Sequence, residues 1–160
     1  GTGISPIIGF LQAREKAFQQ GTSLAPCLVY FGCRDSSEVL YSEQMERWLR
    51  LGVITAFHVA TSREGPKTYV QHLIAGQHRE VWELLRNPAC HVYICGDSVM
   101  GEEVKAELVT AALRCSPMDR LSVVDAFEDM RKEGRLQSDT WGVGLHGSAA
   151  QDAFISDQEG

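Results

Sequence analysis

The segment Thr-Ser-Arg-Glu-Gly-Pro-Lys-Thr-Tyr at residues 61–69 combines side chains that suit a phosphorylated nucleotide. Arg63 can hold a phosphate through two parallel hydrogen bonds, Lys67 adds a second positive charge, and Ser62 adds a donor. Tyr69 supplies a flat ring on which a purine can stack. A solvated polar loop is the alternative interpretation. Because NAD-type sites place an acidic residue on the ribose, the cations favour a nucleotide with an extra phosphate.

Gly1, Thr2 and Gly3 come directly before a predicted helix. The two glycines would let the backbone approach a pyrophosphate, Thr2 would donate a hydroxyl, and the helix amides would point at the anion. Two glycines near a helix start are also common at ordinary turns, and the pattern is not a full G-x-G-x-x-G fingerprint. The sequence opens on this loop with no strand before it, which indicates a piece of a longer protein with its first strand missing.

A third candidate group follows two apolar strands. Cys95, Gly96 and Asp97 end the run HVYICGD, and Asp139 and Trp141 end the run RLQSDTW. Open α/β sheets bind ligands outside the carboxyl ends of their strands, where the small sulfur of Cys95 could lie against a flat ring. The alternatives are a buried apolar cysteine, a surface aspartate and a core tryptophan. Trp48 and Trp82 lie within predicted helices and are interpreted as packing residues.

These groups must be positioned by an alternation of strands and helices. Apolar runs predict strands over 27–33, 53–62, 91–96 and 135–141, with helical patterns over 7–21, 69–87, 97–114 and 122–134 and a short helix that ends at Gly52. The first helix has Ile7, Leu11 and Phe18 at roughly helical spacing. Asp97 or Ser98 is predicted to cap the third of these helices. Ser122 is predicted to cap the last, and Gly134 to end it.

The alternation predicts an α/β fold in which a parallel sheet carries helices on both faces. Residues 1–141 are predicted to form this one domain. Residues 142–160 lose the periodicity, are rich in small and polar residues, and are interpreted as a C-terminal tail.

Composition narrows the function classes. The chain has 160 residues, 44% of them hydrophobic, which suffices for one sizeable core. A net charge of −6 with scattered basic residues argues against nucleic-acid binding. Five cysteines without zinc-ligand spacing predict free thiols, no metal site and a cytoplasmic setting, although a membrane anchor could lie in a missing segment.

Five ordered motifs carry a resemblance to a known family. GTGISP, YFGCRD, SRE…KTYVQ, YICGDS and the final DTW, across nearly all of residues 1–141, resemble the NADP(H)-binding domain of the diflavin reductases, within the wider ferredoxin–NADP reductase family. The resemblance implies a Rossmann-like nucleotide-binding domain over residues 1–141, in which a five-stranded parallel sheet with helices on both faces forms three layers. It also implies that NADPH lies across the carboxyl edge of the sheet and passes hydride to an FAD. That FAD would be held by a preceding domain, and electrons would continue through an FMN-binding domain of the same parent chain to an acceptor such as a hemoprotein.

The resemblance also implies site residues. Cys95, Asp139 and Trp141 match the positions at the nicotinamide and flavin, with Trp141 as the aromatic that covers the flavin ring. The implied NADPH-binding positions are Gly1, Thr2, Gly3, Arg34, Ser62, Arg63, Lys67, Tyr69, Gln71, Gly96 and Asp97.

Two features of this chain bear on its place within the diflavin reductases, and two rival functions share some of its motifs. The extension after Trp141 is more similar to the reductase half of nitric oxide synthase, which has phenylalanine where this chain has Trp141.

A single-flavin reductase of the ferredoxin or cytochrome b5 type would share the GTGI and CG motifs, but YFGCRD and DTW count against it. A non-catalytic NADP(H)-binding module is the alternative from another class.

Overall fold

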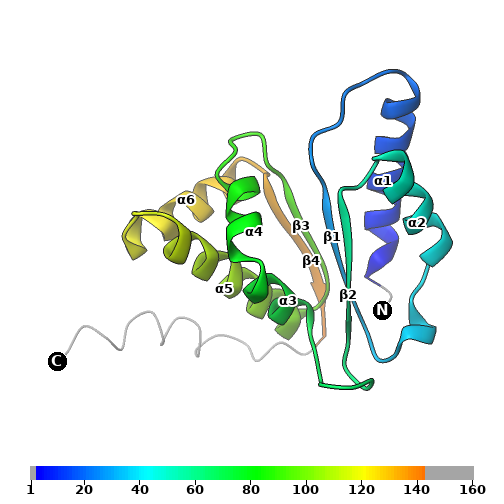
Figure 1. Ribbon diagram of the computed structural model, residues 1–160. Coiled ribbons are helices and arrows are strands. Elements are labelled where there is room, and N and C mark those ends of the chain that lie inside the picture. Colours follow the sequence, from blue (N-terminus) through cyan, green and yellow to red (C-terminus); the bar gives the residue numbers. More distant parts are fainter. Residues whose placement is uncertain (1–2, 143–160) are drawn as a thin grey trace.

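The computed structural model describes residues 3–142, which alternate strands and helices along the chain (Figure 1). The strands are β1 (Leu28–Cys33), β2 (Ala56–Thr61), β3 (Val92–Asp97) and β4 (Leu136–Trp141). The helices are α1 (Ile4–Gln19), α2 (Ser42–Leu51), α3 (Val70–Gly76), α4 (His78–Leu85), α5 (Ser98–Cys115) and α6 (Arg120–Lys132), with a short 3₁₀ helix η1 (Ser36–Glu38).

The strands pair in parallel as two separate ladders. β1 pairs with β2 from Leu28↔Ala56 to Cys33↔Thr61, and β3 pairs with β4 from Val92↔Leu136 to Asp97↔Trp141. All four strands run in the same direction, so their carboxyl ends lie toward one edge (Figure 1). The predicted parallel α/β architecture is confirmed. The predicted single sheet of five strands is not confirmed, since residues 3–142 form two sheets of two strands each.

Helices cover both faces of the strands, as a layered α/β fold requires. On one side, α1 and α2 bury Leu11, Met45 and Trp48 against β1. On the other side, α3 to α6 form a second core, which includes Ile94 of β3 and Leu108 of α5. Trp48 is fully buried, and Trp82 packs against the second core, so both tryptophans act in packing as predicted.

One face of α1 packs into the core through Ile4, Ile8 and Leu11, whereas Phe18 is 41% exposed. The same spacing of four and three residues continues to Glu15 and then to Phe18. Glu15 accepts a hydrogen bond of 2.7 Å from Nε1 of Trp48 and also pairs with Arg47. The buried part of this face therefore ends at a polar residue, and Phe18 lies at the surface beyond it.

Two helix boundaries also differ from the sequence-based expectation. Asp119, and not Ser122, caps α6, because its carboxylate accepts a hydrogen bond of 2.8 Å from the Ser122 amide. The predicted helix over 69–87 is two helices, since Gln77 leaves the helical conformation (φ −126°) directly after Gly76. The predicted stops at Gly52 and Gly134 are confirmed, and both glycines have positive φ.

The described residues contain no disulfide. Their five cysteines are free thiols. Within residues 3–142, no helix is long and apolar enough to cross a bilayer, and no group of three or more His, Cys, Asp or Glu side chains could hold a metal ion.

Candidate nucleotide-binding site

The loops after β1 and β2 bring the predicted phosphate-binding cations together. Beyond the paired residues Cys33 and Thr61, the Ser62 amide donates to the Cys33 carbonyl at 3.1 Å. The Arg63 amide then donates to the Arg34 carbonyl at 2.8 Å. The backbone pairing of the two strands thus continues into their loops, and it places two arginines side by side. Their proximity follows from the register of β1 and β2.

Lys67 and Tyr69 complete this first group, which we call the cation cluster (Arg34, Arg63, Lys67 and Tyr69). The Lys67 ammonium lies over the Tyr69 ring at 5.3 Å from the centroid. Tyr69 is 39% exposed and leads directly into α3. Within residues 3–142, neither the two arginines nor Lys67 forms an ion pair with a carboxylate. The three cationic side chains therefore lie outside any ion pair of residues 3–142, beside an accessible aromatic ring, which suits an anionic nucleotide.

Gln71 is positioned differently from the rest of the predicted binding residues. Its Nε2 donates to Oε2 of Glu103 on α5 at 2.6 Å, which ties α3 to α5. Its Oε1 is buried and accepts no hydrogen bond from the described part of the chain. A buried acceptor without a donor is unfavourable. The structure therefore shows Gln71 as a link between α3 and α5, and its role in nucleotide binding stays a prediction.

The second group lies where β3 and β4 end. Cys95 and Asp139 are partners in the parallel register, and Asp97 and Trp141 are partners two positions further on. Trp141 is 46% exposed, which excludes the core alternative for this residue. Asp97 caps α5, because its Oδ1 accepts from the amides of Val99 and Met100 at 2.9 and 3.2 Å. The predicted cap is confirmed, and the carboxylate is already engaged by the helix.

Glycines allow the backbone segments of this group to approach closely. A Cβ atom on Gly3 would lie 2.5 Å from the carbonyl oxygen of Cys95, so the start of α1 can contact the end of β3 only with glycine there. Gly96 has φ +144°, a conformation that favours glycine. Gly1 and Thr2 lie outside the described residues, as does the predicted tail from residue 143 onward. The structure therefore places Gly3 of the predicted phosphate loop and leaves the other two positions undescribed.

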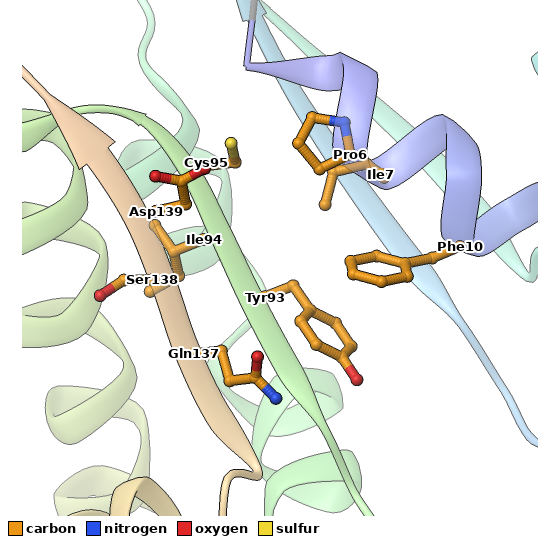
Figure 2. Close-up of a pocket in the computed structure, with 9 residues that line it drawn as sticks. All are labelled: Pro6, Ile7, Phe10, Tyr93, Ile94, Cys95, Gln137, Ser138 and Asp139. Carbon is orange, nitrogen blue, oxygen red and sulfur yellow. The ribbon is translucent and has the colours of Figure 1, made fainter.

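Cys95 and Asp139 line a small groove between α1 and the β3–β4 sheet (Figure 2). Its volume of about 210 Å³ is below the roughly 300–1,000 Å³ of typical ligand pockets. The groove therefore accommodates a single ring and not a whole dinucleotide. Its lining residues are Pro6, Ile7, Phe10, Tyr93, Ile94, Cys95, Gln137, Ser138 and Asp139.

The sequence motifs gave no indication of the aromatic wall of this groove, which Phe10 and Tyr93 form. Phe10 and Tyr93 have ring centroids 4.4 Å apart, and both rings are exposed by at least 40%. The alternation of a strand would have revealed Tyr93, because it lies two residues before Cys95 and so on the same face of β3. The spacing gave no such indication for Phe10, since the contact depends on how α1 crosses β3.

Electrostatics determine what the Cys95 thiol can do. Burial raises its pKa above the ordinary value, and the neighbouring Asp139 carboxylate raises the pKa further. At neutral pH the sulfur therefore remains a protonated thiol and not a thiolate nucleophile. Its suitable role is van der Waals contact with a ring, beside a carboxylate that can interact with positive charge.

The residues of both groups fit a pyridine dinucleotide that carries an extra phosphate. The cation cluster matches the phosphorylated adenosine end, and the N-terminus of α1 at Gly3, which no side chain of residues 3–142 caps, offers helix amides to a pyrophosphate. The groove beside Cys95 matches the size of a nicotinamide ring.

Comparison with known proteins agrees with this geometry. The model of the oxidoreductase NAD-binding domain family matches residues 1–106. The chain is 37% identical to the NADPH–cytochrome P450 reductases of Sus scrofa and Homo sapiens and 36% identical to that of Rattus norvegicus. Each match covers 88% of this chain and 21% of the relative, so the chain spans about a fifth of the length of those proteins. The resemblance to diflavin reductases is thereby confirmed, and the chain belongs to the oxidoreductase NAD-binding domain family.

Proposed function

We propose that this chain is the NADPH-binding module of a flavin-dependent reductase. The observation that carries the proposal is the cation cluster, in which Arg34, Arg63 and Lys67 lie without carboxylate partners in residues 3–142 at the carboxyl edge of β1 and β2. NAD-type sites place an acidic residue near the ribose, whereas this edge offers positive charge for a 2′-phosphate. The similarity to NADPH–cytochrome P450 reductases supports the same assignment.

In the complete protein, we propose that residues 1–141 belong to one five-stranded parallel sheet and that 142–160 is an appended tail. Two features support a further strand that precedes Gly1 and lies between β1 and β3. No ladder joins β1 to β3 within residues 3–142, although both run in the same direction (Figure 1). The close contact of Gly3 with the Cys95 carbonyl places the start of α1 beside β3, where such a strand would end.

The proposed chemistry belongs to the cofactors. Bound NADPH supplies hydride to an FAD, which the remaining part of the parent chain would hold together with an FMN. The role of this chain is orientation and charge. The neutral Cys95 thiol packs against the nicotinamide, the Asp139 carboxylate stabilises the positive charge that builds up there, and the exposed Trp141 ring covers the flavin until NADPH displaces it.

The proposed partners follow from this role. They are the FAD-binding and FMN-binding domains of the same parent chain and an electron-acceptor protein such as a hemoprotein. We propose a cytoplasmic location for this domain, because five free thiols suit a reducing compartment.

Calorimetric titration of the protein with NADP⁺ and NAD⁺ tests the proposed function. Charge-assisted hydrogen bonds contribute about 1.5–3 kcal/mol each. Loss of the 2′-phosphate should therefore weaken binding by roughly two orders of magnitude or more. Equal affinities for the two nucleotides would refute the assignment of the cation cluster.

Changes at the groove should affect the reaction and not nucleotide affinity. In the full-length protein, Cys95→Ala and Asp139→Asn are each expected to slow flavin reduction by NADPH by roughly tenfold or more, because both groups act at the reacting ring. NADP⁺ affinity should change by less than about twofold, since most binding energy comes from the adenosine end. Stopped-flow absorbance of the flavin measures the rate, with Asp125→Asn on α6 as a control for the change in charge. Wild-type rates in both variants would leave Cys95 and Asp139 with structural roles only.

A further inference from the structure

A hydrogen-bonded bridge joins the two loops that carry the arginines of the cation cluster. Glu64 follows Arg63 in the loop after β2, and its carboxylate reaches the loop after β1. Its Oε2 accepts from the Ser36 amide at 2.9 Å, and its Oε1 accepts from the Ser36 hydroxyl at 3.0 Å. Both carboxylate oxygens are thus used on one residue that lies two positions after Arg34. We refer to these two contacts as the Glu64–Ser36 bridge.

Each end of the bridge is itself held by local hydrogen bonds. On the Ser36 side, the Asp35 carboxylate accepts from the Ser37 amide at 3.1 Å, and Glu38 accepts from the Arg34 amide at 3.2 Å. On the Glu64 side, the Thr68 amide donates to the Thr61 carbonyl at 3.0 Å, which closes the loop on β2. The bridge therefore links two loops that are each held by their own hydrogen bonds. A displacement of one loop would displace the other.

From this geometry we infer that Glu64 is a positioning residue for the 2′-phosphate end of the nucleotide, an inference that rests on the proposed function. Backbone hydrogen bonds from Ser62 to Cys33 and from Arg63 to Arg34 hold the loops together where they leave the strands. The Glu64–Ser36 bridge joins the loops further out, beyond both arginines, and fixes their separation there. A phosphate that is held by charged donors on both loops requires a fixed separation between them.

The sign of the expected effect separates positioning from simple electrostatics. A carboxylate near a bound phosphate repels it, so removal of the charge alone would tighten binding. Loss of the bridge instead lets the two loops move apart and weakens binding. The variants below differ in charge and in reach, and they distinguish these two outcomes.

The test is calorimetric titration of the full-length gene product with adenosine 2′,5′-bisphosphate and with adenosine 5′-monophosphate. Glu64→Asp keeps the negative charge, but its side chain is too short to form the bridge. Glu64→Ala removes the charge and the bridge together. Each is expected to lower affinity for the bisphosphate by about tenfold and to change affinity for the monophosphate by less than about twofold. Glu64→Gln keeps the length and one acceptor oxygen, and it should retain affinity within about threefold of the wild type.

Two control variants complete the design. Asp125→Asn on α6 removes one negative charge away from the loops and should leave both affinities unchanged. Ser36→Ala removes only the hydroxyl half of the bridge, and an intermediate loss of bisphosphate affinity is expected even if Glu64→Ala fails to fold. Unchanged or tighter bisphosphate binding in Glu64→Ala and Glu64→Asp would overturn the inference, as would an equal loss for both ligands. Failure of the wild-type protein to prefer the bisphosphate would instead refute the proposed function.

Discussion

Simultaneous replacement of Arg63 and Lys67 by alanine is expected to weaken NADP⁺ binding by two orders of magnitude or more. The two side chains together would contribute about 3–6 kcal/mol through charge-assisted contacts with the 2′-phosphate. NAD⁺ lacks that phosphate, so its affinity should stay within about threefold of the wild-type value. Calorimetric titration with both nucleotides measures the two affinities and therefore the change in their ratio.

A matched double variant controls for net charge. Lys16→Ala with Arg79→Ala also removes one lysine and one arginine, from the exposed surfaces of α1 and α4. Screening limits the influence of such distant charges, so this variant should bind NADP⁺ nearly as the wild type does. If the control loses as much affinity as Arg63→Ala with Lys67→Ala, the effect is long-range electrostatics and the 2′-phosphate contact is absent.

The sequence predicted the elements whose boundaries are set by local chemistry. The order of strands and helices, the Asp97 cap of α5 and the glycine stops at Gly52 and Gly134 all depend on a few neighbouring residues. Such local preferences can be recognised without knowledge of the fold. Burial is less predictable than helix formation. Phe18 lies on the same helical face as Leu11, yet it is exposed, because the core that covers this face ends at Glu15.

The residue types of the candidate site could be predicted from the sequence, but the hydrogen bonds that join its loops could not. Arg63 and Lys67 stood out because their charges lie in one short segment after a strand. The link from Glu64 to Ser36 joins positions 28 residues apart. It exists only because Cys33 and Thr61 are paired in register. The pairing of the strands was likewise not predictable, because apolar runs indicate strands but not which of them pair, and β1 and β3 form no ladder within residues 3–142.

Trp141 is the residue for which exposure and position together suggest the largest effect on cofactor choice. Its indole is 46% exposed at the end of β4, opposite Asp97 and two residues beyond Asp139. If the ring covers the flavin, nicotinamide must displace it before reaction. NADPH can offset that cost with the binding energy of its 2′-phosphate end, whereas NADH has no equivalent contact.

Trp141→Ala in the full-length protein is therefore expected to raise the kcat/KM for NADH relative to that for NADPH. Stacking of an aromatic side chain on a flat ring contributes about 1–3 kcal/mol, so the ratio should rise by roughly tenfold or more. Turnover with NADPH should not rise, because slower release of NADP⁺ then limits it. Trp141→Phe retains an aromatic cover and should stay much closer to the wild-type ratio. Steady-state assays with both cofactors provide the measurement, and an unchanged ratio in Trp141→Ala would show that this tryptophan does not compete with nicotinamide for the flavin.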